Sequence, residues 1–183
     1  MSFLGYFING ISLGSVYAII ALGYTMVYGI AKMLNFAHGD VIMVGAFLIY
    51  TAMSSLGLSP ILSVILAMVL CTILGMTIEK IAYRPLRNAG SPLAVLITAI
   101  GVSYLLQNLG LLIFGADTKS FKSIVNMEAL QFAEGQLTVS GEAVVTIIVS
   151  IVIMLALTSF VKYTKAGRAM VAVSEDRGAA QLM

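Results

Sequence analysis

The sequence predicts an all-α integral membrane protein, a polytopic helix bundle with about five transmembrane helices. Of its 183 residues, 60% are apolar and only 10% are charged, whereas a soluble domain carries about a quarter charged residues. The charges leave four windows that contain none, residues 1–31, 41–78, 88–116 and 143–161. Polar and apolar residues do not alternate in these windows as they do in the strands of a membrane barrel. Helices that satisfy their own backbone hydrogen bonds are therefore expected.

Five spans follow from these windows, because a spanning helix needs about 20 predominantly apolar residues. No basic segment precedes the first window, so we expect it to be retained as a span and not removed as a signal peptide. The lone Cys71 lies in an apolar window and needs no role beyond that of a small buried side chain. The predicted spans are Phe3–Ala31, Asn35–Leu56, Ile61–Ile78, Pro92–Gly115 and Ala143–Lys162.

The first span carries small residues at every fourth position, Gly10, Gly14 and Ala18. Residues at this spacing share one helix face, and small side chains let helices approach closely in lipid. We therefore predict a helix-packing role for the three residues.

The second predicted span begins with a polar turn, Asn35–Asp40, and its apolar core, Val41–Met53, is too short to cross alone. The turn either lies at membrane depth, where it lines a protein interior or aqueous path, or lies at the cytoplasmic interface with Asn35 as helix N-cap. The second helix is accordingly expected to be broken or re-entrant. Gly39 would supply the backbone freedom for a sharp entry.

His38 and Asp40 are the only pair of ionisable residues that the sequence places near membrane depth. Residues two apart do not share a helix face, so structural hydrogen-bonding roles are expected for both, with a proton relay as the alternative. The polar residues Ser103, Gln107 and Asn108 could bond between helices or line a pore. These residues offer no metal-ligand spacing and no nucleophile with a base, so we expect no metal and no catalytic residue.

The placement of Lys and Arg predicts the orientation by the positive-inside rule. Lys80, Arg84 and Arg87 flank one loop, and further basic residues follow the last span. Residues 1–163 are thus the transmembrane bundle with an external loop at about 117–142, and residues 164–183 are cytoplasmic. In this tail Ser174 is expected to cap a helix with Glu175 and Asp176 in its first turn. An apolar face of that helix would dock on a partner or lie on the membrane.

Several functions are excluded by the same composition. The net charge of +2 and the apolar spans are not those of a nucleic-acid binder. A phosphate-binding loop of the GxxxxGK[ST] type is absent from the sequence. The chain is therefore expected not to be an enzyme and to bind no cofactor, and any ATP would be used by a separate subunit.

Several motifs resemble the membrane permease subunits of branched-chain amino acid ABC importers, the leucine, isoleucine and valine uptake systems of bacteria. They occur in order along nearly the whole chain. They are Gly10-x-x-x-Gly14-x-x-Tyr17-Ala18, Asn35-Phe36-Ala37-His38-Gly39-Asp40, Tyr83-Arg84-Pro85-Leu86-Arg87, Ile100-Gly101-Val102-Ser103, Leu106-Gln107-Asn108, Gly167-Arg168-Ala169 and Ser174-Glu175-Asp176.

The resemblance implies a permease subunit in the bacterial inner membrane that forms a path for branched-chain or related amino acids. Its partners would be a second permease subunit, cytoplasmic ATP-binding subunits and an external substrate-binding protein. The alternative is a secondary carrier or channel for small polar solutes such as urea or amides. Members of the family continue beyond the position of Met183, so an N-terminal fragment with a truncated tail is expected.

The resemblance also sorts the candidate residues. Those expected to line the translocation path or act in gating are Asn35, His38, Gly39, Asp40, Ser103, Gln107 and Asn108. Those expected to couple the chain to an ATPase are Gly167, Arg168, Glu175, Asp176, Ala180 and Leu182.

Overall fold

A computed structural model of the chain describes residues 3–86, 92–120, 130–132 and 137–176. The chain forms two compact units, the first made of Met1–Lys32 with Ser123–Met183 and the second of Met33–Lys122. Helices make up nearly all of the described structure, with one short strand pair beside them. The predicted all-α membrane fold is confirmed.

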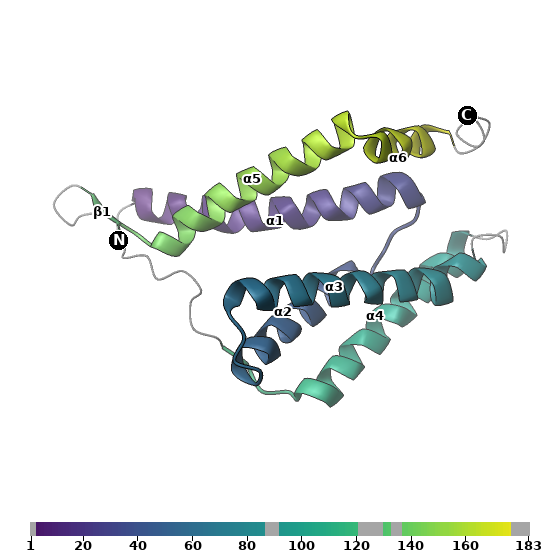
Figure 1. The fold of residues 1–183 in the computed structure, drawn as a ribbon, viewed down its shortest axis with the longest axis horizontal. Coiled ribbons are helices and arrows are strands. Elements are labelled where there is room, and N and C mark those ends of the chain that lie inside the picture. Colours follow the sequence, from purple (N-terminus) through teal and green to yellow (C-terminus); the bar gives the residue numbers. More distant parts are fainter. Residues whose placement is uncertain (1–2, 87–91, 121–129, 133–136, 177–183) are drawn as a thin grey trace. The chain divides into compact units, whose positions relative to one another are not determined.

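The first unit pairs the first helix of the chain with the last two. This unit also contains two short strands, β1 (Leu130–Phe132) and β2 (Leu137–Val139), which pair antiparallel with Leu130 opposite Val139. Figure 1 shows α1 and α5 side by side, and α1 also packs against α6. Its elements are α1 (Phe3–Ala31), β1 (Leu130–Phe132), β2 (Leu137–Val139), α5 (Gly141–Tyr163) and α6 (Lys165–Glu175).

The second unit is a bundle of three helices in which α2 packs against both α3 and α4. A π-helical turn and a short 3₁₀ turn prolong α3, and the π-helical turn contacts α4. The elements are α2 (His38–Ser54), α3 (Pro60–Ile78), the π-helical turn Glu79–Tyr83, the 3₁₀ turn Arg84–Leu86 and α4 (Pro92–Phe114).

Four described helices are long and apolar enough to cross a membrane, and α2 is shorter. The 17 residues of α2 rise about 25 Å at 1.5 Å per residue, less than the ~30 Å of a hydrocarbon core. Four of the five predicted spans thus correspond to helices long enough to cross a membrane, and the second corresponds to the shorter helix α2. The four are Phe3–Ile30, Pro60–Leu86, Leu93–Phe114 and Gly141–Tyr163.

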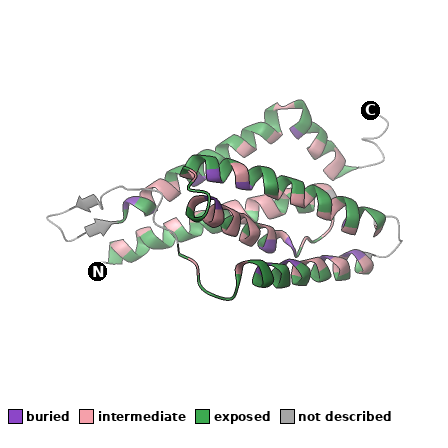
Figure 2. Cartoon of the chain, turned by 60° about the horizontal axis from the view of Figure 1, so that its bottom comes forward, coloured by how far each residue is buried: buried purple, intermediate pink, exposed green. Residues whose placement is uncertain are grey.

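Exposed apolar surface covers most of these helices, and Figure 2 shows buried positions only as single purple bands. Exposing such an apolar surface to water is unfavourable, whereas in a bilayer it contacts the apolar lipid chains. Small residues dominate where the helices of the second unit meet, because close approach is what stabilises helix contacts in lipid. The small buried residues of this unit are Ala37, Ala52, Ser63, Ala67, Ala99 and Gly110.

The turn between α2 and α3 has a clear local cause. Gly57 has a φ of +62°, a left-handed conformation that glycine adopts without steric cost. The amide of Leu58 then donates to the carbonyl of Ala52 at 3.0 Å and closes the end of α2. Pro60 opens α3 at a position where no amide hydrogen is needed.

The structure contains neither of the two caps considered from the sequence, Asn35 as one of two alternatives for the polar turn and Ser174 as the expected cap of a tail helix. The N-cap of α2 is Ala37 and not Asn35, and it makes no side-chain hydrogen bond. Ser174 does not begin a helix either, because α6 continues through it to Glu175, and its hydroxyl donates to the carbonyl of Val171. Glu175 therefore lies in the last turn of α6, and Asp176 is its C-cap.

Lys32 ends α1 in a conformation that suits glycine better. Its φ is 53°, and its amide donates to the carbonyl of Tyr28 at 2.8 Å, which closes the last turn of the helix. Glycine is the usual residue at such a position because a Cβ is crowded there.

We expect Lys32→Gly to raise the free energy of unfolding by about 1 kcal/mol, since it removes that crowding. The measurement is a denaturant titration of the purified full-length protein in detergent micelles. Lys32→Ala is the control, because it removes the charge and keeps the Cβ. An equal gain in both variants would trace the effect to the charge and contradict the backbone explanation.

Candidate functional site

A buried carboxylate lies between α2 and α4 in the second unit. Asp40, in the first turn of α2, is only 8% exposed. Its Oδ2 accepts a hydrogen bond from the Ser103 hydroxyl at 2.5 Å, and its Oδ1 accepts one from the Gln107 amide nitrogen at 3.0 Å. The Gln107 nitrogen also lies 3.2 Å from Ser103 Oγ. The three side chains form a closed ring, which we call the Asp40 ring.

The ring depends on helix geometry in α4. Ser103 and Gln107 are four residues apart, so they lie one above the other on one helix face. Both present donors toward α2, and the ring therefore holds the first turn of α2 against α4. Three of the seven predicted path residues, Asp40, Ser103 and Gln107, are brought together here.

The contacts along α2 and α4 show where α2 begins. Met43 Cε lies 3.1 Å from the position that a Cβ on Gly110 would take. Farther along, the rings of Phe47 and Phe114 stack with centroids 4.4 Å apart. The two helices thus run parallel, and α2 starts beside Ser103, the twelfth of the 23 residues of α4. Of the two alternatives for the polar turn, this favours a position at depth within the bundle.

Asp40 also lies close to a helix N-terminus. The N-terminus of a helix carries a partial positive charge, and Asp40 stands in the first turn of α2. The two donors of the ring, a hydroxyl and an amide, are neutral. The charge of the carboxylate is thus solvated by dipoles within the ring.

A second polar contact holds the segment before α2. The Tyr83 hydroxyl donates to Asn35 Oδ1 at 2.9 Å, and Tyr83 is only 5% exposed. Tyr83 is the last residue of the π-helical turn, and such turns often occur at functional sites. Asn35 therefore uses its side chain in a tertiary contact and not as a cap.

Tyr83 was not among the residues predicted for the site. It was noted only as part of the motif Tyr83-Arg84-Pro85-Leu86-Arg87. The available signal was a phenol beside basic residues at a helix end, and a buried phenol usually finds a hydrogen-bond partner.

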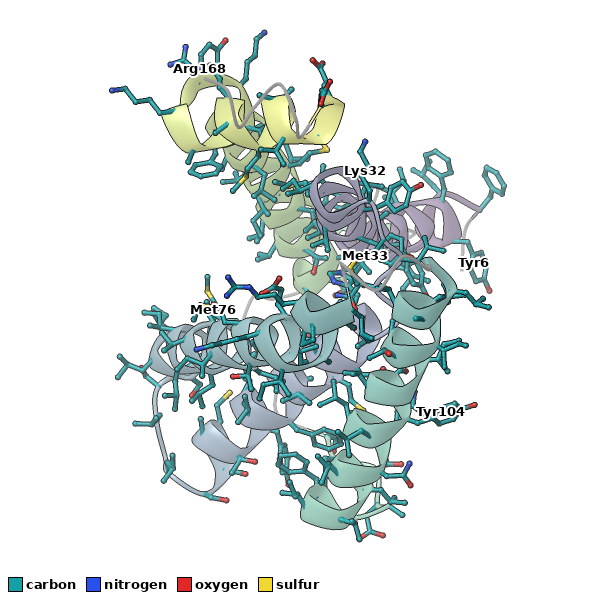
Figure 3. All side chains as sticks on the ribbon, turned by 90° about the vertical axis from the view of Figure 1, so that its right-hand side faces the viewer. Tyr6, Lys32, Met33, Met76, Tyr104 and Arg168 are labelled. Atoms are coloured by element: carbon teal, nitrogen blue, oxygen red, sulfur yellow. The ribbon has the colours of Figure 1, made fainter. Side chains whose placement is uncertain are left out.

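Of the remaining path candidates, Gly39 and Asn108 take no part in the ring. Gly39 is exposed and regularly helical, and nothing lies within 4 Å of a Cβ built on it, so the predicted need for glycine there is wrong. His38 is half-buried at the first position of α2. Asn108 donates to the carbonyl of Tyr104 on its own helix at 2.7 Å, and Tyr104 points away from the unit (Figure 3).

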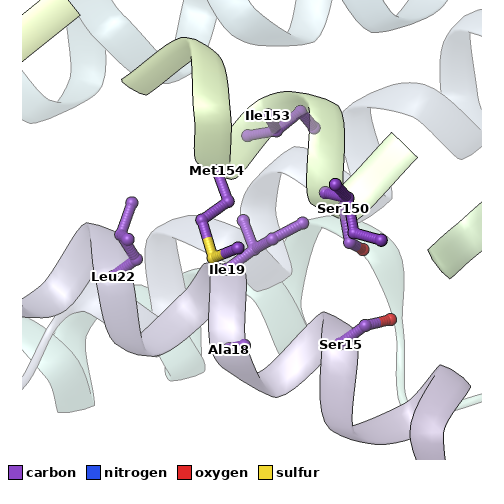
Figure 4. Close-up of a pocket in the computed structure, with 8 residues that line it drawn as sticks. Ser15, Ala18, Ile19, Leu22, Ser150, Ile153 and Met154 are labelled. Atoms are coloured by element: carbon purple, nitrogen blue, oxygen red, sulfur yellow. The ribbon is translucent and has the colours of Figure 1, made fainter. Parts of the chain in front are cut away.

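The predicted packing residues of α1 differ from one another. Nothing described lies within 4 Å of a Cβ on Gly10 or Gly14, so their packing role stays a prediction. Ala18 lines an apolar pocket of about 80 Å³ between α1 and α5, where Ser15 and Ile19 face Ser150 and Met154 (Figure 4). Ala18 therefore lies at the boundary between α1 and α5.

A sharp corner joins α5 to α6. Thr164 caps α6, since its Oγ1 accepts from the amide of Gly167 at 2.9 Å. Gly167 is buried, and a Cβ on it would clash with the backbone of Phe160 and Val161. The predicted coupling residue Gly167 thus has a structural reason to be glycine.

The other predicted coupling residues lie on or beyond α6. Arg168 and Glu175 are exposed on the helix, and Figure 3 shows Arg168 directed outward. Met170, Val171 and Ser174 instead face α1 across a second pocket. Ala180 and Leu182 lie outside the described residues.

Metal binding finds no support in the described ranges, where no group of three or more His, Cys, Asp or Glu side chains could hold an ion. That no metal binds stays a prediction.

Comparisons with known proteins place these features in context. A family model described as the permease component of branched-chain amino acid transport systems matches residues 6–183. The high-affinity branched-chain amino acid transport system permease protein LivH of Escherichia coli K12 is 40% identical over 194 residues, which cover 99% of this chain and 62% of LivH. BraD, the corresponding permease protein of Pseudomonas aeruginosa, is 39% identical over 95% of this chain and 60% of its own length. The chain thus spans about three fifths of these relatives, and no solved structure matches it.

The contact between Tyr83 and Asn35 gives a prediction about stability. Tyr83→Phe should lower the free energy of unfolding by about 1 kcal/mol, the usual net contribution of one hydrogen bond. A double-mutant cycle with Asn35→Ala, measured by denaturant titration in micelles, isolates the pairwise term. Tyr104→Phe is the control, since Tyr104 is 63% exposed. Additive effects of Tyr83→Phe and Asn35→Ala would show that the contact contributes nothing.

The corner at Gly167 gives a second prediction. Gly167→Ala should destabilise the protein by about 1–3 kcal/mol, because the new methyl group meets backbone atoms that cannot rotate away. Gly39→Ala is the matched control, and it should be neutral or stabilising by up to about 1 kcal/mol in an open helical position. Thermal unfolding of both variants in micelles is the measurement. Equal midpoints for the two variants would contradict the close approach at Gly167.

Proposed function

Because the chain belongs to the permease family of branched-chain amino acid transport systems, we propose that it is the membrane permease subunit of an ATP-binding cassette importer. Its role is to form part of the translocation path for branched-chain or related amino acids. The observation that carries the proposal is the Asp40 ring, a polar cluster half-way along an apolar helix. Polar groups at that depth are costly and mark solute pathways.

The chain is a multi-pass protein of the plasma membrane, as its apolar helices and its relatives indicate. Its basic residues support an orientation with the π-helical end of α3 and all of α6 in the cytoplasm. Residues 117–142 are then external, on the side of the membrane that a substrate-binding protein reaches. Under this proposal α2 and α4 both run outward, as their parallel packing requires.

Two kinds of partner complete the proposed importer besides the substrate-binding protein. A second permease subunit closes the path, and cytoplasmic ATP-binding subunits supply the energy. The absence of a phosphate-binding loop from the sequence supports a chain that is itself non-catalytic and binds no cofactor.

The described geometry supports α6 as the site of coupling to the ATP-binding subunits. It is a short helix with exposed Arg168 and Glu175, joined to α5 by the Gly167 corner. Its side facing α1 is apolar, so a force on α6 acts on the transmembrane helices of the first unit. Asp176, Ala180 and Leu182 extend the proposed coupling segment.

The experiment reconstitutes the full-length transporter with its partner subunits in proteoliposomes and measures uptake of radioactive leucine. Uptake should require ATP, the ATP-binding subunits and the substrate-binding protein. Uptake that persists without ATP would overturn the proposal and favour a secondary carrier or channel.

Charge reversal tests the coupling segment in the same system. Glu175→Arg should lower leucine uptake at least ~10-fold with normal membrane insertion, because it places a repulsive charge in the contact with the ATP-binding subunit. Asp117→Arg is the matched control, since Asp117 is 89% exposed and lies in the predicted external loop. Equal uptake by the two variants would reject α6 as the coupling site.

A further inference from the structure

The carboxylate of Asp40 has acceptor capacity that its ring does not use. An ionised carboxylate has about four lone-pair sites, and Ser103 and Gln107 fill one on each oxygen. Both ring donors are neutral, so the ring orients the carboxylate without cancelling its charge. A charge at this depth is costly unless it meets an opposite charge.

The three side chains of the ring differ in exposure. Asp40 is buried and Ser103 half-buried, whereas Gln107 is exposed, as is Tyr104 on the neighbouring face of α4. The Gln107 amide is therefore the part of the ring nearest to the molecular surface. Beyond the ring, the contacts of α2 with α4 are apolar, with Met43 against Gly110 and Phe47 stacked on Phe114.

We propose that Asp40, oriented by Ser103 and Gln107, receives the α-ammonium group of the amino acid substrate during its passage. This inference rests on the proposed permease function. An ammonium group offers three donors and a positive charge, which match the free lone pairs and the charge of the carboxylate. The apolar contacts beside the ring suit a branched aliphatic side chain.

Charge-selective labelling tests this directly in the reconstituted full-length transporter. Ser103→Cys, in a Cys71→Ala background, places a thiol in the ring. We expect 2-aminoethyl methanethiosulfonate, a cation, to react at least ~10-fold faster than the anionic 2-sulfonatoethyl reagent. Adding Asp40→Asn should bring the two rates within about twofold. Unreactive thiols, or a preference that survives Asp40→Asn, would overturn the proposal.

Protection by substrate keeps the test decisive even where Asp40→Asn fails to assemble. Saturating leucine should slow the cationic reagent at Ser103→Cys several-fold. 4-Methylpentanoate, which has the same skeleton without the ammonium group, should leave the rate unchanged. Equal protection by both compounds, or by neither, rejects ammonium recognition.

Uptake separates this inference from the proposed function. Asp40→Asn should lower leucine uptake at least ~10-fold while the substrate-binding protein still stimulates ATP hydrolysis. Thr98→Val is the control, because the Thr98 hydroxyl bonds only its own helix, at the carbonyl of Ala94. ATP-driven uptake that is equal in wild type and Asp40→Asn would reject the ammonium site and leave the permease function standing. No ATP-driven uptake in wild type would reject both.

Discussion

The second unit depends on the hydrogen bonds that join the Asp40 carboxylate to α4. Hydrocarbon offers no water to solvate a charge, so the carboxylate must find its donors in the protein. Ser103 and Gln107 supply them from adjacent turns of one helix. Sliding α2 by one turn, about 5.4 Å, would strip both oxygens of their partners. The apolar contacts at Met43 and Phe47 then follow in the same register.

The helices could be predicted from the sequence because a span in lipid is a local property of the chain. A long run without charge is enough to specify it, and α1, α3, α4 and α5 begin and end within three residues of the predicted spans. The shortness of α2 was likewise visible in the brief apolar core that follows Asp40. The parallel packing of α2 and α4 is consistent with the alternation of successive spans.

The features of the structure that could not be predicted are those that depend on a contact with a residue far away in the sequence. Asn35 has the composition of a cap, but Tyr83, 48 residues away, engages its side chain instead. Ser174 also looks like a cap, yet α6 passes through it. Asp40, Ser103 and Gln107 were each singled out as polar residues at depth, but their union in one ring requires the register of α2 on α4. Local preferences are worth about 1 kcal/mol, and tertiary contacts override them.

The corner at Gly167 makes α5 and α6 behave as a rigid elbow. At this corner the backbone of Gly167 packs directly against the backbone of Phe160 and Val161, so no side chain can change rotamer there to absorb a displacement. A rotation imposed on α6 therefore turns the C-terminal half of α5 as well. Empty space that leaves room for side chains to shift lies beside this corner, in the pocket that Val161 and Met170 line opposite α1, and farther along α5 in the pocket around Ser150 and Met154.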